Sequence, residues 1–254
     1  CISVYESALS HTRRRRRSNN ATDRAKTLVV AFSGGAVNKI GIPRHEFRRT
    51  LLASAVVTSA CDKLYVLDPT GMSMYAHELA TFEQRLRDLI GGYTRCVFIG
   101  NCMGATGALR FAHLLPSASS TVIAVNPEIA PAQDMRSIFR VAAVVQPRIC
   151  RTLPAVLQDS IDRSSGRIRV HSSSWDPERA QCNVLRYGTE VNVSNPDSTG
   201  CAAALHRCCN ERVAKLVYST CRTHGMLGNV LRPSGGLVAI IEEAVLYRSN
   251  TVSS

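Results

Sequence analysis

The segment that most constrains the fold of this chain runs from residue 97 to residue 109. It begins as a short apolar run, passes through Gly100-Asn101-Cys102-Met103-Gly104, and continues with small and apolar residues that suit a helix. Small residues two positions before and after Cys102 allow a strand and a helix to approach closely at a sharp turn. The helix N-terminus would then lower the pKa of the thiol. The pattern predicts a cysteine nucleophile, and a buried structural cysteine in an ordinary turn is the alternative.

Segments typical of strands and helices alternate along the rest of the chain. The expected strands are 27–32, 63–68, 95–100, 121–126, 167–172 and 190–194, and the expected helices are 45–57, 75–90, 104–115, 177–185, 201–209 and 236–247. Residues 213–220 suit either type of element. Because no hairpin signal joins consecutive strands, we predict an α/β fold with a mostly parallel sheet and helices on both faces.

Three regions follow from this pattern. Residues 27–254 are expected to form a single domain, and residues 1–26 a basic N-terminal arm. Residues 128–166 contain Pro131, Pro147 and Pro154 and read as irregular, helix-containing structure. They fall where an insertion would lie, so we expect a possible lid there.

The composition indicates a folded protein without a membrane-spanning segment. The chain has 254 residues, of which 45% are hydrophobic and 20% charged, which is enough for a sizeable core. No apolar run reaches the roughly 18 residues that a membrane-spanning helix needs. The ten cysteines contain no Cys-x-x-Cys pair, so we expect free thiols in a reducing compartment and no metal site. The glycine pattern matches no phosphate-binding loop, and no cofactor is predicted.

The net charge of +12 is concentrated partly in one run of arginines near the N-terminus. This run consists of Arg13, Arg14, Arg15, Arg16 and Arg17. Such a run could contact an acidic protein, an anionic surface or RNA, or it could reflect codon bias alone. The surrounding residues are rich in arginine and nearly free of acids, which is also compatible with the remnant of a signal for import into an organelle lumen or matrix.

Four segments stand out between residues 27 and 130, and they read AFSGGA, LYVLDPTGMSMY, IGNCMGATGAL and AVNPEI. Together they resemble the α/β-hydrolase fold superfamily, and the resemblance covers residues 27–130 well. Within it, they look like a microbial hydrolase-like group, many of whose members have no established substrate. Cys102 stands where most members have serine, and dienelactone hydrolases are members that use cysteine. The resemblance implies an elbow framed by Gly100 and Gly104, with oxyanion-binding backbone N–H groups at Gly34 and Met103.

The resemblance also implies an acid and a histidine, in that order, on loops after later strands. His224 is the best candidate for the histidine, whereas Asp176 and Asp197 compete for the acid. Three candidate strands follow residue 126, where the family has two. An inserted strand would move His224 away from Cys102 by about 4.8 Å. If residues 213–220 are helical instead, the loop after residues 190–194 has no histidine and the catalytic machinery is lost.

Two functions therefore compete. The first is an ester or acyl hydrolase, or an acyltransferase, in which Cys102 attacks a small acyl or ester substrate. The second is an inactive hydrolase-fold protein that serves as a structural or interaction subunit of a larger assembly, with the arginine-rich arm contacting an acidic partner.

Overall fold

The computed structural model describes most of the chain outside the N-terminal arm. The described residues are 27–34, 45–68, 75, 79–129, 147–174, 183–195, 197–207, 211–219 and 226–247. The predicted arm, residues 1–26, lies outside them.

A single sheet of seven strands organises the described residues, and every strand pair in it is parallel. The order across the sheet is β2-β1-β3-β4-β5-β7-β6. The strands are β1 (Thr27–Phe32), β2 (Cys61–Val66), β3 (Arg95–Asn101), β4 (Thr121–Val125), β5 (Arg167–Ser173), β6 (Thr189–Val193) and β7 (Val213–Tyr218). The ambiguous segment at residues 213–220 is thus a strand. The predicted parallel sheet is confirmed.

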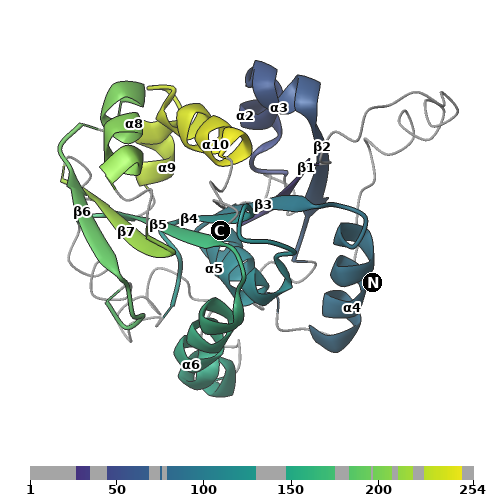
Figure 1. Cartoon of the computed structure of the whole chain (residues 1–254). Coiled ribbons are helices and arrows are strands. Elements are labelled where there is room, and N and C mark those ends of the chain that lie inside the picture. The colour runs from purple at the N-terminus through teal and green to yellow at the C-terminus, as the bar shows by residue number, and fades with distance from the viewer. Residues whose placement is uncertain are drawn as a thin grey trace, which may run out of the picture.

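Helices cover both faces of this sheet (Figure 1). One face carries α4 (Leu79–Ile90), α5 (Met103–Arg110), the short 3₁₀ helix η2 (Ala112–Leu114) and α6 (Pro147–Arg163). The other carries α2 (Arg48–Ala53), α3 (Ala55–Ala60), α8 (Ser198–Arg207), α9 (Met226–Leu231) and α10 (Gly236–Leu246). Because both faces are buried, the central strands read as nearly continuous apolar runs.

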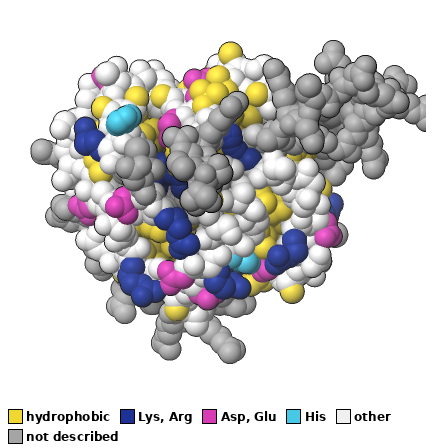
Figure 2. Space-filling model, viewed as in Figure 1, with side chains coloured by type: hydrophobic (Ala, Val, Ile, Leu, Met, Phe, Trp, Pro, Cys, Tyr) yellow, Lys and Arg dark blue, Asp and Glu magenta, His cyan; other side chains and the backbone are white. Residues whose placement is uncertain are grey.

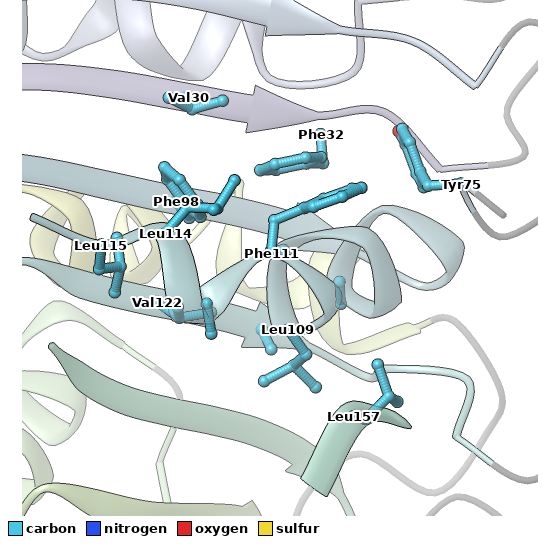
Figure 3. Close-up of a cluster of buried hydrophobic side chains, with 14 of the residues drawn as sticks. Val30, Phe32, Tyr75, Phe98, Leu109, Phe111, Leu114, Leu115, Val122 and Leu157 are labelled. Carbon is cyan, nitrogen blue, oxygen red and sulfur yellow. The ribbon is translucent and has the colours of Figure 1, made fainter. Parts of the chain in front are cut away.

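A cluster of aromatic rings fixes α5 against the sheet (Figure 3). The ring of Phe32 in β1 packs edge-on against Phe98 in β3, with 5.4 Å between centroids, and stacks on Phe111 just after α5 at 6.0 Å. All eight residues of α5 are buried. This packing therefore holds the helix that follows Cys102 in a fixed position against the sheet.

Several predicted bounds differ from the observed ones. The helix expected at residues 45–57 is two short helices, because Ser54 is extended and its side chain accepts a hydrogen bond from Val57 N, which starts α3. Within the predicted lid, residues 128–166, α6 buries Leu153, Leu157 and Ile161 in the core. Residues 130–146 of that segment lie outside the described residues.

The extra strand, β6, lies at the edge of the sheet and does not separate β7 from β5. β7 pairs directly with β5, with Ile168 opposite Val213. β6 exposes alternate residues, as an edge strand does, whereas β7 is almost entirely buried. The ammonium of Lys215 in β7 is fully buried and lies 3.4 Å from the carboxylate of Glu190 in β6. A buried ammonium needs such a partner, which helps to hold β6 beside β7.

Among the described residues, no helix is both long enough and apolar enough to cross a membrane.

His171 in β5 is a core histidine. Its side chain is fully buried, and its Nδ1 lies 2.8 Å from the hydroxyl of Tyr218 in β7. Burial, with a smaller contribution from the charge of Arg169, lowers the pKa of His171 to about 3. The imidazole is therefore neutral in the folded protein near neutral pH.

This burial predicts a pH-dependent loss of stability. An unfolded histidine takes up a proton near pH 6.5, whereas folded His171 does so only near pH 3. The free energy of unfolding should therefore fall as the pH is lowered from 6.5 towards 3, by at most about 1.4 kcal/mol per pH unit from this group. In urea denaturation, His171→Gln should flatten this slope, whereas the same change at the exposed His206 should not. Equal slopes in the wild type and the His171 variant would contradict the assignment.

Candidate functional site

Cys102 lies at the turn between β3 and α5 in an unusual backbone conformation. Its φ is 55° and its ψ is −125°. Its backbone N–H still donates to Val125 O of β4 at 2.9 Å, and its own carbonyl accepts from Ala105 N at 2.9 Å, in the first turn of α5. A side chain at positive φ costs of order 1–3 kcal/mol and persists only where the surrounding structure enforces it.

Two glycines allow this turn to be so sharp. A Cβ atom on Gly100 would overlap the backbone carbonyl of Gly104, and one on Gly104 would overlap the carbonyl oxygen of Phe32 in β1. β3, α5 and β1 therefore meet backbone to backbone around Cys102. Side chains at either position would push the strand and the helix apart.

Glu128 is the side chain that contacts the Cys102 thiol. The thiol donates to Glu128 Oε1, with 2.9 Å between sulfur and oxygen. Glu128 follows β4, is 6% exposed, and accepts a hydrogen bond on its backbone oxygen from Thr106 Oγ1 of α5 at 2.7 Å. The sequence patterns did not single out Glu128. The signal available was its place just after the strand that neighbours β3, where loops meet at the carboxyl edge of the sheet.

The pKa of the Cys102 thiol is raised well above its ordinary value. Burial is the largest cause, followed by the charge of Glu128 and its hydrogen bond, whereas the Met103 backbone N–H acts in the opposite direction and Glu46 adds to the rise. The prediction that the helix N-terminus lowers this pKa is wrong for this conformation. The contribution of Met103 at the N-terminus of α5 is present, but burial and a carboxylate in contact outweigh it.

Gly34 lies beside Cys102, and its backbone N–H is engaged by a second carboxylate. A Cβ atom on Gly34 would be 3.8 Å from Cys102 Cβ. Gly34 N donates to Glu46 Oε2 at 3.0 Å, and Asn101 Nδ2 donates to Glu46 Oε1 at 2.8 Å. The N–H group that the resemblance implies for an oxyanion thus already donates to a side-chain oxygen of Glu46.

Asp68 and Tyr75 position the loop that carries Gly34. Tyr75 Oη donates to Ser33 O at 2.6 Å, and Tyr75 N donates to Asp68 Oδ2 at 3.1 Å. Burial raises the pKa of Tyr75 well above its usual value, so the hydroxyl keeps its proton and its role as a donor.

Of the remaining predicted site residues, only Asp197 is among the described residues, and none of its described contacts is with Cys102. Asp197 lies at the start of α8, after the edge strand β6, and its Oδ1 accepts from Gly200 N at 2.6 Å while its Oδ2 accepts from the Asn195 side chain. Asp176 and His224 lie outside the described residues, as do Arg13, Arg14, Arg15, Arg16 and Arg17. Among the described residues, no group of three His, Cys, Asp or Glu side chains could hold a metal ion.

A contact between Gly228 and Asn101 involves a residue only four positions after His224. Gly228 in α9 lies against the side chain of Asn101, such that a Cβ on Gly228 would be 3.2 Å from Asn101 Oδ1. Asn101 immediately precedes Cys102, so α9 begins near this turn.

Comparison with solved structures identifies the fold. The capsule O-acetyltransferase of Neisseria meningitidis serogroup A gives a TM-score of 0.54 at 12% identity, over 88% of this chain and 89% of that one. The fluorophosphonate-binding serine hydrolase FphF of Staphylococcus aureus gives 0.53 at 10% identity, over 91% and 88%. Carboxyl esterase 2 of the mycorrhizal fungus Tuber melanosporum gives 0.52 at 14% identity, over 89% and 79%. No protein-family profile and no curated protein matches the sequence.

These neighbours and the seven-stranded parallel sheet show that the chain has an α/β-hydrolase-like fold. Sequence identities of this size establish the fold alone.

The close contact at Gly100 predicts a large effect of one methyl group. Gly100→Ala should lower the free energy of unfolding by at least about 2 kcal/mol, because the added Cβ overlaps the backbone of α5. Gly92→Ala is the matched control, since a Cβ there meets nothing within 4 Å, and it should change stability by less than about 0.5 kcal/mol. Chemical denaturation of both variants measures the difference. Equal effects would mean that the turn tolerates a wider separation of β3 and α5.

Proposed function

We propose that this chain is an acyl-transfer enzyme, an ester or acyl hydrolase or an acyltransferase, with Cys102 as the nucleophile. The observation that carries the proposal is the strained conformation of Cys102, φ 55° and ψ −125°, at the turn between a parallel strand and a buried helix. Strain of this kind is concentrated at functional sites. The adjacent backbone N–H groups of Gly34 and Met103 support the same chemistry, because two such donors can stabilise an oxyanion.

His224 is the proposed general base. It follows β7, which pairs directly with β5, so the edge strand β6 adds no separation from Cys102. Gly228 lies against Asn101 and is only four residues after His224, a stretch that spans at most about 14 Å. The chain therefore limits how far this histidine can be from the thiol.

Asp176 is the proposed acid, in preference to Asp197. Asp176 lies two residues beyond the described end of the β5 segment, and β5 is next to β7. Asp197 follows the edge strand, and both of its carboxylate oxygens are engaged at the start of α8. A carboxylate that caps a helix is poorly free to orient a histidine.

The proposed reaction proceeds through a thioester. The thiol proton passes to His224, the sulfur bonds to the substrate carbonyl carbon, and the oxyanion accepts hydrogen bonds from Gly34 and Met103. The carbon–oxygen bond then breaks as His224 protonates the leaving alcohol, and water or an acceptor alcohol releases the acyl group. Before the first step, Glu46 has to leave Gly34 and Glu128 has to release the thiol.

A second candidate function is an inactive subunit of a larger assembly. The observation in its favour is that internal carboxylates hold both the thiol and the Gly34 N–H. On the face that Figure 2 shows, acidic and basic side chains of the described residues lie interspersed. Arg186 also pairs with Asp162. In this second function, Arg13, Arg14, Arg15, Arg16 and Arg17 of the basic arm would contact a partner with acidic groups, an anionic surface or RNA.

Turnover of p-nitrophenyl esters tests the proposal. Cys102→Ala should abolish turnover, because it removes the attacking atom, and His224→Ala should lower kcat by at least about 100-fold, because it removes the base. Both variants should unfold at the same denaturant concentration as the wild type to within the error. Turnover that survives in folded Cys102→Ala would overturn the assignment of the nucleophile, and a wild type that cleaves no ester would favour the inactive subunit.

The two aspartates are distinguished by a paired substitution. Asp176→Asn should lower kcat at least about 100-fold, because the histidine loses the group that holds its orientation. Asp197→Asn should keep kcat within about threefold and instead lower stability by about 1 kcal/mol, as loss of a helix cap does. The reverse pattern of kcat values would make Asp197 the acid.

A further inference from the structure

The contact between Glu128 and Cys102 is held firmly from both sides. Cys102 is fixed by the backbone around Gly100 and Gly104, and Glu128 is fixed at its backbone by Thr106 of α5. The carboxylate is almost completely buried, and the sulfur lies 2.9 Å from Oε1. The thiol is therefore one of the donors on which this buried carboxylate depends.

This contact opposes the first step of the proposed reaction. Once the thiol gives up its proton, a negative sulfur and a negative oxygen face each other across the same short distance, which is unfavourable because Glu128 is almost completely buried. Among the described residues, three groups act on the sulfur: Glu128 after β4, Glu46 ahead of α2, and the Met103 N–H at the start of α5. The two charged groups of this set are both negative. In the proposed reaction His224 becomes positive when it takes the thiol proton, and an ammonium group on the substrate would add a second positive charge directly at Glu128.

We propose that Glu128 recognises acyl donors that carry an ammonium group a few bonds from the scissile carbonyl, and that this ammonium releases Cys102 for attack. The inference rests on the proposed acyl-transfer function and names its substrate class. The ammonium replaces the thiol as a donor to Glu128, and its charge offsets the thiolate as it forms.

The distances suit a short spacer between the ammonium and the acyl carbon. A carbonyl carbon ready for attack lies about 3–3.5 Å from the sulfur. An ammonium on Glu128 Oε1 lies about 2.8 Å from that oxygen, and the oxygen is 2.9 Å from the sulfur. A 3-aminopropanoyl group spans this gap. The bond changes are those of the proposed reaction: sulfur–carbon forms, carbon–oxygen breaks, and the thiol proton travels through His224 to the leaving alcohol.

Three p-nitrophenyl esters of nearly equal size test the inference. They are the 3-aminopropanoate, which is cationic, the butanoate, which is neutral, and the hydrogen succinate, which is anionic. In the wild type, kcat/KM should be at least about tenfold higher for the cationic ester than for the neutral one, and lowest for the anionic ester. Glu128→Gln should remove the tenfold preference. Glu46→Gln removes a carboxylate that contacts Gly34 rather than the thiol, so it should keep the order of the three esters.

Alkylation of Cys102 by iodoacetamide gives a second readout that needs no turnover. Glu128→Gln should increase the rate at pH 8 about tenfold, because a neutral amide no longer opposes the thiolate, and peptide mass spectrometry should locate the label on Cys102. The butanoate should still be cleaved by this variant, which a variant that fails to fold could not do.

The outcomes separate the two levels of the proposal. A wild type that prefers the butanoate, or a Glu128→Gln variant that keeps the cationic preference, overturns the role of Glu128 and leaves acyl transfer standing. A wild type that cleaves none of the three esters overturns both the substrate class and the proposed function.

Discussion

The close approach of β3, α5 and β1 around Cys102 is the constraint on which the candidate site depends. At Gly100 and Gly104 the backbones of these elements are in direct contact. Helix α5 is completely buried, and the stacked rings of Phe32 and Phe111 hold it in this position. Cys102 therefore stays at φ 55° although this conformation is strained. The strain is localised at Cys102, and the packing of α5 and its neighbours on this face of the sheet compensates for its cost. Packed elements therefore hold the atom to which we assign the attack in the proposed reaction.

The groups around this turn raise the pKa of the Cys102 thiol, whereas the N-terminus of α5 alone would lower it. The N-terminus of α5 favours an anion, and an oxygen anion is present, but it belongs to Glu128 and contacts the thiol. Glu46 occupies the neighbouring Gly34 N–H in the same way. In the proposed acyl transfer, the substrate and the oxyanion would use positions that the protein's own carboxylates take in this conformation.

The order of strands decides which parts of the chain can cooperate at this site. β6 could have lain between β5 and β7, and each loop beyond it would then have moved outward by about 4.8 Å. Instead the buried ammonium of Lys215 meets Glu190 on β6 at the outer side of β7. β7 keeps its place beside β5, and Asp176 and His224 come after these two neighbouring strands in the sequence. An additional strand is accommodated without a change in the inner part of the sheet.

Local sequence determined the alternation of strands and helices, the parallel α/β class and the sharp turn at Cys102, because hydrophobic periodicity and glycine spacing act within a few residues. The alternation of exposed and buried residues in β6 could have indicated an edge strand. Tertiary structure alone decided that β7 pairs with β5 and that Glu128 contacts the thiol. The second contact depends on the register that sets Asn101 opposite Val125, so that Cys102 and the loop after β4 emerge side by side. Register between strands arises from packing across the whole sheet, and no short stretch of sequence contains it.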